Sequence, residues 1–145
     1  METQPKIYNG GLAVDDRGVV SFVNDFNFEG VKRSYMVENH EIGFIRAWHG
    51  HKNEGKYVSV VNGSAIVGAI SITQPNFEYK DPQRYVLSSK KPQILWIPPG
   101  FANGFKSLEE NTKIIFYSTS TLEESLNDDI RFPHDKWDIW NIEYR

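Results

Sequence analysis

The chain has 145 residues, a formal net charge of −3 at pH 7 and no cysteine. This length is enough for a real core, so we expect a single domain over residues 1–145. The absence of cysteine excludes disulfides, thiolate zinc sites and cysteine nucleophiles, and the acidic balance without a basic patch argues against nucleic-acid binding.

No stretch of the sequence has the character of a membrane span or an export signal. No apolar run approaches the roughly 20 residues that a membrane-spanning helix needs. The first residues, METQPK, lack the apolar segment of a signal peptide. We therefore expect a cytoplasmic protein with no membrane partner.

Short runs of β-forming residues, separated by turn residues, follow one another along the chain. Their alternation of apolar and polar side chains, or their Val and Ile content, predicts strands. Many short strands with almost no helix indicate a sandwich or a small barrel. The expected strands are residues 19–23, 31–37, 44–48, 57–61, 65–72, 85–87, 94–97 and 113–118.

Two local signals add to this pattern. Asn62-Gly63 favours a tight hairpin, so residues 65–72 should pair back on residues 57–61. Residues 121–125, TLEES, are the helix-like segment of the sequence, with a capping box expected at their start.

The chemistry concentrates between Gly43 and Gly63, in a segment that contains His49 and His51. Residues two apart on a strand point to the same face. The pair has three interpretations: histidines satisfied by hydrogen bonds, a metal site to which Glu54 adds a carboxylate, or a site of proton transfer. Arg46 has the opposite parity, so it joins that face only if the strand bulges.

Several residues resemble the two sequence motifs of the cupin superfamily. They are Gly43, His49-x-His51 and Gly63, followed by Pro98-Pro-Gly100. The resemblance implies an all-β cupin jelly roll, also called a double-stranded β-helix. Metal-binding cupins carry a histidine after the second motif at the position that Asn103 occupies here. Asparagine is a weak ligand for metals that imidazole suits, so we expect no metal and no cofactor.

Five segments, in the right order, resemble the dTDP-4-dehydrorhamnose 3,5-epimerase family, a metal-independent group that acts on nucleotide-linked sugars. Together they extend over most of the chain. The longest, WIPPGFANGF, differs from the family pattern by an asparagine in place of a histidine. The segments are Asp16–Gly18, Asn39–His40, Arg46–His49, Gly55–Val58 and Trp96–Phe105.

This resemblance implies roles for individual residues. In the family a base removes the acidified proton beside the ketone of a 4-keto sugar, and His49 matches that base. Lys56 matches the residue that stabilises the enolate. Arg46 and Arg17 match residues that hold the substrate, where the fork of arginine suits a diphosphate. The early arginine acts across a dimer interface in the family, so a homodimer is implied.

Other positions of the resemblance are less direct. Asn39 matches a hydrogen-bonding residue of the family pocket, and Asn103 stands where the long segment has its histidine, so both are candidate substrate-binding residues. The carboxylate partner of the family's base lies in a late segment of the chain. Asp135 is the nearest candidate for that catalytic partner here.

The epimerases carry a tyrosine just after the strand that matches residues 113–118, as the acid for the opposite face of the sugar. Residues 119–123 contain no tyrosine, and Tyr117 need not point inward on an alternating strand. The segment from Arg46 to Lys52 also resembles the dTDP-sugar 3,4-ketoisomerases, in which one face and one or two histidines suffice. In that interpretation His51 is the second proton carrier.

The sequence therefore predicts an epimerase or isomerase that enolises a nucleotide-linked 4-keto-6-deoxyhexose for surface polysaccharides such as lipopolysaccharide. Two other classes stay open. A cupin that kept the sugar pocket and lost turnover would bind the same ligand without catalysis. A metal-dependent cupin oxygenase or isomerase would contain a bound metal after purification.

Overall fold

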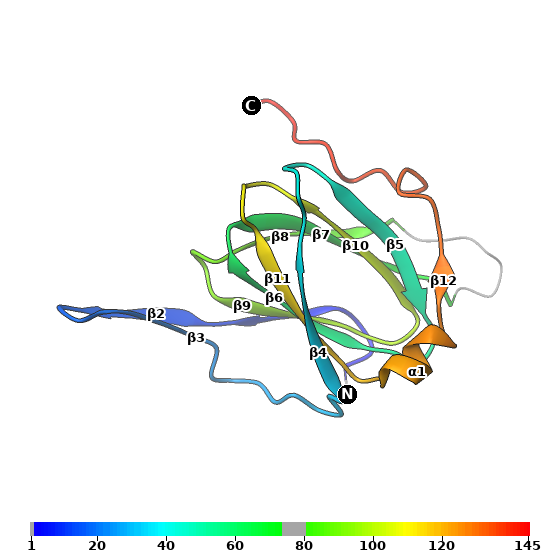
Figure 1. Cartoon of the computed structure of the whole chain (residues 1–145), viewed down its shortest axis with the longest axis horizontal. Coiled ribbons are helices and arrows are strands. Elements are labelled where there is room, and N and C mark those ends of the chain that lie inside the picture. Colours follow the sequence, from blue (N-terminus) through cyan, green and yellow to red (C-terminus); the bar gives the residue numbers. More distant parts are fainter. Residues whose placement is uncertain (1, 74–80) are drawn as a thin grey trace.

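The computed structural model describes residues 2–73 and 81–145 as two antiparallel sheets and a projecting hairpin (Figure 1). Sheet I has the strand order β1-β9-β6-β11-β4, sheet II has the order β12-β5-β10-β7-β8, and β2 pairs with β3. The strands are β1 (Lys6–Asn9), β2 (Gly11–Asp15), β3 (Gly18–Phe22), β4 (Arg33–Glu38), β5 (Ile45–His51), β6 (Lys56–Asn62), β7 (Ser64–Ser71), β8 (Gln83–Ser88), β9 (Gln93–Ile97), β10 (Phe101–Ser107), β11 (Lys113–Ser118) and β12 (Ile130–Arg131).

The main core lies between the two sheets. Val58, Leu95 and Phe116 of sheet I pack with Val67 and Phe105 of sheet II in one buried cluster. Alternation along each strand gives one face of each sheet to this core. The arrangement confirms the predicted all-β jelly roll.

Both sheets also bury part of their outer faces. Tyr57 and Trp96 are buried on the outside of sheet I. On the outside of sheet II, Trp48 packs against Trp140, and both indole N–H groups donate to the backbone oxygen of His134. The aromatic C-terminal segment therefore covers sheet II behind β5.

The turn at Gly63 does not form the predicted hairpin. β6 lies in sheet I and β7 lies in sheet II, so the pairing expected between residues 57–61 and 65–72 is wrong. Gly63 has a φ of 76°, and a Cβ there would lie 2.4 Å from the Thr112 hydroxyl. The same turn chemistry that suits a hairpin here passes the chain from one sheet to the other.

The other predicted strands are present with slightly different ends, and β1, β2, β10 and β12 are additional. The predicted helix is present as α1 (Leu122–Leu126), and a capping box joins Thr121 and Glu124 at its start. In the part of the chain that the structure describes, no helix is long and apolar enough to cross a membrane.

The β2–β3 hairpin projects away from both sheets as an arm (Figure 1). Its apolar side chains are exposed, with 71% of Val14, 60% of Val19 and 64% of Val20 accessible to solvent. Arg17 lies in the turn between the two strands.

Candidate active site

A cavity of about 150 Å³ lies between the sheets, where β4, β5, β6, β10 and β11 meet. Four of the predicted site residues line it, namely Arg46, His49, Lys56 and Asn103. Pockets for drug-sized ligands usually measure about 300–1,000 Å³, so this cavity suits a sugar ring and is too small for a whole nucleotide sugar. The other lining residues are Tyr35, Val37, Gly104, Phe105 and Phe116.

A β-bulge brings Arg46 to the same side of β5 as His49. β5 pairs with β10 at both residues, and the two residues between them stand opposite the single residue Gly104. Those two residues, Ala47 and Trp48, pack outward, and the peptide bond between them is cis. A Cβ on Gly104 would lie 2.4 Å from the Ala47 Cβ, so the close approach requires glycine. On a regular strand Arg46 and His49 would point to opposite faces, and the bulge gives them the same face.

Asn39 orients Arg46 at the edge of the cavity. Arg46 Nε donates to Asn39 Oδ1 over 2.6 Å. The Asn39 amide nitrogen in turn donates to Ser107 Oγ over 3.1 Å and to the Phe44 carbonyl over 3.4 Å. The predicted binding residue Asn39 therefore acts on the cavity through the guanidinium that it holds.

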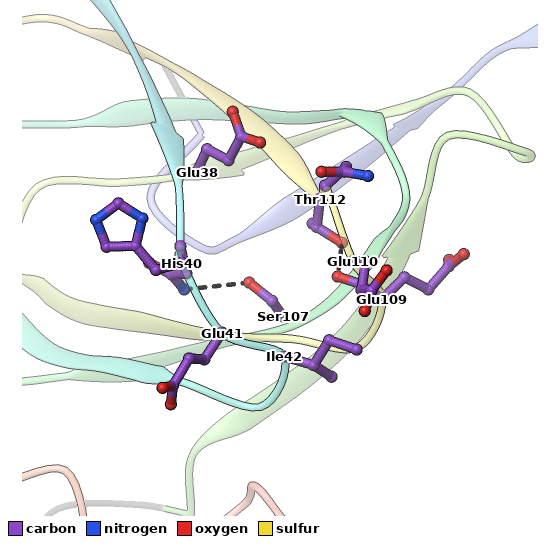
Figure 2. A pocket seen from close by; sticks show the side chains of 10 residues that line it. Glu38, His40, Glu41, Ile42, Ser107, Glu109, Glu110 and Thr112 are labelled. Atoms are coloured by element: carbon purple, nitrogen blue, oxygen red, sulfur yellow. Dashed lines mark hydrogen bonds between the residues drawn. The ribbon is translucent and has the colours of Figure 1, made fainter.

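A larger cavity, of about 730 Å³, adjoins Asn39 on its other side. Figure 2 shows Glu38, Glu41, Glu109 and Glu110 around it. Four carboxylates repel an anionic diphosphate. Among the described residues that line this larger cavity, Asn39 is the only predicted site residue. The smaller cavity is therefore the candidate active site.

His49 is half-buried in that cavity and lies opposite Arg131 of β12. Burial, together with the positive charges of Arg131 and Lys56, lowers the pKa of His49 to about 4, and Asp129 acts in the opposite direction. The imidazole is therefore neutral at neutral pH and can accept a proton.

Asp129 is the carboxylate whose charge favours protonated His49. It accepts a hydrogen bond from Arg131 Nε over 2.7 Å. The predicted partner Asp135 is exposed, and within residues 2–73 and 81–145 no contact joins it to His49. No signal in the sequence indicates Asp129, because it directly precedes β12, a strand of two residues that is too short to show an alternating pattern.

Lys56 belongs to a buried cluster behind the cavity. Its Nζ lies 3.3 Å from Glu54 Oε2 and 3.3 Å from His51 Nε2, and these two atoms are 3.4 Å apart. Arg33 approaches the other Glu54 oxygen to 3.4 Å. Of these four side chains, Lys56 is the one that lines the cavity, so the other predicted histidine, His51, acts on the cavity through the lysine.

Asp128 holds both His51 and the turn after β5. Its backbone oxygen accepts the hydrogen of His51 Nδ1, so Nε2 carries the lone pair that faces Lys56. Burial and the charge of Lys56 lower the pKa of His51, which favours this neutral ring. The Asp128 carboxylate accepts the backbone N–H groups of residues 52–54 at 2.8, 2.8 and 3.2 Å. No pattern in the sequence indicates this role.

Two further candidates lie away from the cavity. Arg17 pairs with Asp15 in the arm, and 87% of its side chain is exposed. Tyr117 packs on the outside of sheet I, with its ring 4.5 Å from that of Phe28. In the segment that lacks a tyrosine, the Thr119 hydroxyl oxygen accepts a hydrogen bond from the backbone N–H of Gly55, which directly precedes β6.

The two histidines of β5 do not form a metal site with a carboxylate. Across the ranges 2–73 and 81–145, no three His, Asp or Glu side chains are placed to hold a metal ion. His49 lines the cavity, whereas His51 faces Glu54 and Lys56. The two imidazoles therefore have separate surroundings although they share a strand.

Comparison with known proteins gives the family context. A family model described as dTDP-4-dehydrorhamnose 3,5-epimerase matches residues 10–142. The spore coat polysaccharide biosynthesis protein SpsL of Bacillus subtilis is 28% identical over 107 residues, which cover 71% of this chain and 71% of SpsL.

Solved structures show the same architecture. The dTDP-4-dehydrorhamnose 3,5-epimerase of Bacillus anthracis, with TDP and PPi bound, has a TM-score of 0.77 and 23% identity, over 98% of this chain and 87% of that one. The QdtA 3,4-ketoisomerase of Thermoanaerobacterium thermosaccharolyticum, in complex with TDP, has a TM-score of 0.70 and 18% identity, over 91% and 90%. An epimerase and a ketoisomerase thus share this fold, so the fold does not distinguish the two reactions.

Proposed function

The chain belongs to the dTDP-4-dehydrorhamnose 3,5-epimerase family, and from this premise we propose that it isomerises a nucleotide-linked 4-keto-6-deoxyhexose by enolisation beside the ketone. The observation that carries the proposal is the convergence of Arg46, His49, Lys56 and Asn103 on one cavity. They include a neutral imidazole, an ammonium and a guanidinium, which are the groups that an enolisation of an anionic substrate needs.

The proposed reaction begins with neutral His49. Its free ring nitrogen takes the proton from a carbon next to the ketone, and the electron pair of that C–H bond moves onto the carbonyl oxygen. Lys56, which is buried, provides positive charge for the enolate oxygen. Glu54 keeps that ammonium paired before the substrate arrives.

Substrate binding is divided between the cavity and its edge. The cavity volume of about 150 Å³ suits the sugar, so the nucleotide lies outside it. Arg46, oriented by Asn39, is placed to hold a phosphate oxygen with its fork. Asn103 offers a neutral donor and acceptor for a sugar hydroxyl.

The arm supports a homodimer in which Arg17 of one copy serves the cavity of the other. Val14, Val19 and Val20 are exposed on the arm, and apolar surface of this kind marks a contact with a partner. Arg17 is remote from the cavity of its own chain. In the proposed dimer, Arg17 of one copy contacts the substrate diphosphate at the cavity of the other.

The substrate class suggests the wider setting. Nucleotide-linked deoxy sugars are building blocks of surface polysaccharides such as lipopolysaccharide, and the relative SpsL is named for polysaccharide biosynthesis. We therefore place the protein in the cytoplasm, in a route that supplies such a polymer.

The test is proton exchange. Wild-type protein incubated with dTDP-4-keto-6-deoxyglucose in deuterated water should introduce deuterium at carbon 3 or carbon 5, detected by NMR. His49→Asn should slow this exchange by about 10²–10⁴-fold, the usual contribution of a general base. His134→Asn, at an exposed histidine, is the matched control and should exchange as wild type does. Absence of exchange by the wild-type protein would contradict the function.

Two alternatives are distinguished in the same sample. A 3,4-ketoisomerase is favoured by the lack of a tyrosine at residues 119–123, and it would give a product with the ketone at carbon 3. A binding protein without turnover would bind the dTDP-sugar and leave its carbon-bound protons at carbons 3 and 5 in place.

A further inference from the structure

Tyr35 faces the candidate active site from the wall opposite His49. Side chains along β4 alternate between half-buried and exposed, and Arg33, Tyr35 and Val37 are the half-buried set. Tyr35 and Val37 line the cavity from sheet I, whereas His49 lines it from sheet II. A sugar ring between the sheets would therefore present one face to each of the two side chains.

The surroundings of Tyr35 hold its ring and leave its hydroxyl free. The ring stacks on Phe116, with 5.1 Å between centroids and 13° between planes. The Arg33 guanidinium lies 4.8 Å from the centre of the ring. Within the described ranges the hydroxyl makes no hydrogen bond, and Tyr35 lines the cavity. An oriented ring with an unused donor is suited to a ligand.

Other tyrosines do not offer this arrangement. Tyr8, Tyr57 and Tyr117 pack on the outside of sheet I. Tyr85 donates to Gln83, and Tyr144 is fully exposed. Among the tyrosines that the structure describes, Tyr35 is the one in the cavity.

We propose that Tyr35 is the acid that returns a proton to the sugar from the face opposite His49, so that this site inverts the carbon and is an epimerase. The inference rests on the proposed function. His49 takes the proton and leaves an enolate, and the enolate carbon then takes the hydroxyl proton of Tyr35. The Arg33 guanidinium lies over the ring of the phenolate that remains and stabilises its charge. Water then restores the proton of Tyr35, and protonated His49 gives its proton to water.

The test compares Tyr35→Phe with wild type in deuterated water, with dTDP-4-keto-6-deoxyglucose as substrate. Tyr117→Phe is the matched control, because it removes the same hydroxyl from the outer face of the same sheet. Tyr35→Phe should form the inverted sugar at least about 100-fold more slowly. Deuterium should still enter the recovered starting sugar, because His49 exchanges its own proton with solvent.

Each outcome is decisive. Inversion by Tyr35→Phe within about twofold of wild type, or wild-type exchange without any inverted product, overturns the role of Tyr35 and leaves the proposed enolisation standing. Absence of exchange in the wild-type protein overturns the proposed function, and the role of Tyr35 with it. Tyr117→Phe should match wild type in both measurements.

Discussion

The Glu54 carboxylate lies 3.3 Å from the Lys56 ammonium, and none of the Glu54 side chain is exposed. Burial raises the pKa of Glu54, but the charge of Lys56 and a hydrogen bond from Ser125 outweigh this effect and hold the pKa below its ordinary value. Glu54 is therefore a carboxylate at neutral pH. It balances, away from the cavity, the positive charge that the proposed reaction uses inside the cavity.

Replacing Glu54 by glutamine keeps the volume and removes the charge, so Lys56 and Arg33 lose their buried partner. We expect the free energy of unfolding to fall by about 3 kcal/mol, the scale for breaking a buried pair, in urea denaturation followed by circular dichroism. Glu124→Gln is the control, because it removes an exposed ion pair with Lys32 and keeps the capping box of α1. If Glu54→Gln unfolds at the same urea concentration as this control, the pair does not stabilise the protein.

Arg131→Gln should change the pH dependence of catalysis. The pKa of His49 is about 4, so the neutral imidazole that acts as base predominates above that pH and is lost as the pH falls through it. Arg131 is the largest of the charges that lower this pKa, so its removal raises the pKa. The acid limb of kcat/KM should therefore move to higher pH in Arg131→Gln, and the His49 ring should protonate at higher pH in an NMR titration. Arg145→Gln, at an exposed arginine, should leave the limb in place. If the acid limb of Arg131→Gln is unchanged or moves to lower pH, His49 is not the base whose pKa Arg131 lowers.

The arm leads to a complementation experiment. If Arg17 serves the cavity of a second copy, Arg17→Ala and His49→Asn chains are each inactive alone, whereas a mixed dimer contains one intact site. Equal amounts, mixed and allowed to exchange subunits, should recover about a quarter of wild-type activity, because half of the dimers are mixed and each has one working site. Sedimentation measures the dimer, and exchange in deuterated water measures the activity. A mixture as inactive as its components would show that Arg17 does not act across an interface.

Gly104→Ala tests the bulge that brings Arg46 and His49 together. The new Cβ would lie 2.4 Å from the Ala47 Cβ and 2.9 Å from the Arg46 carbonyl oxygen, so β5 must move. We expect a loss of about 1–3 kcal/mol of stability in thermal denaturation, and a fall in kcat/KM because the side chains of the cavity move with the strand. Adding Ala47→Gly removes one of the two clashes, so the double variant should recover part of both losses. Independent, additive effects of the two substitutions would mean that the residues do not meet in this way.

Strand alternation was enough to predict an all-β fold, because it is a local pattern. Arg46, His49, Lys56 and Asn103 were identified through their resemblance to the family's motifs, which are also short segments of sequence. β10 has no such pattern, since FANGFKS contains no β-branched side chain. The bulge beside His49 depends on register with β10, and the approach of Asp129 depends on the pairing of β12 with β5. These features arise from contacts between distant segments, which no short window of sequence contains. The inward direction of Tyr35 follows from alternation along β4, but its place opposite His49 depends on how the two sheets face each other.

Loss of the C-terminal aromatic segment by proteolysis would affect the strand that contains His49. Trp48 directly precedes His49 in β5. Its indole packs against Trp137 and Trp140, and its N–H donates to the backbone oxygen of His134. Cleavage by a protease ahead of these residues would strip that support from a strand whose next side chain is the proposed base. A purification tag is therefore better placed at the N-terminal end of the chain, and the integrity of the last residues is worth checking by mass spectrometry before any inactive preparation is interpreted.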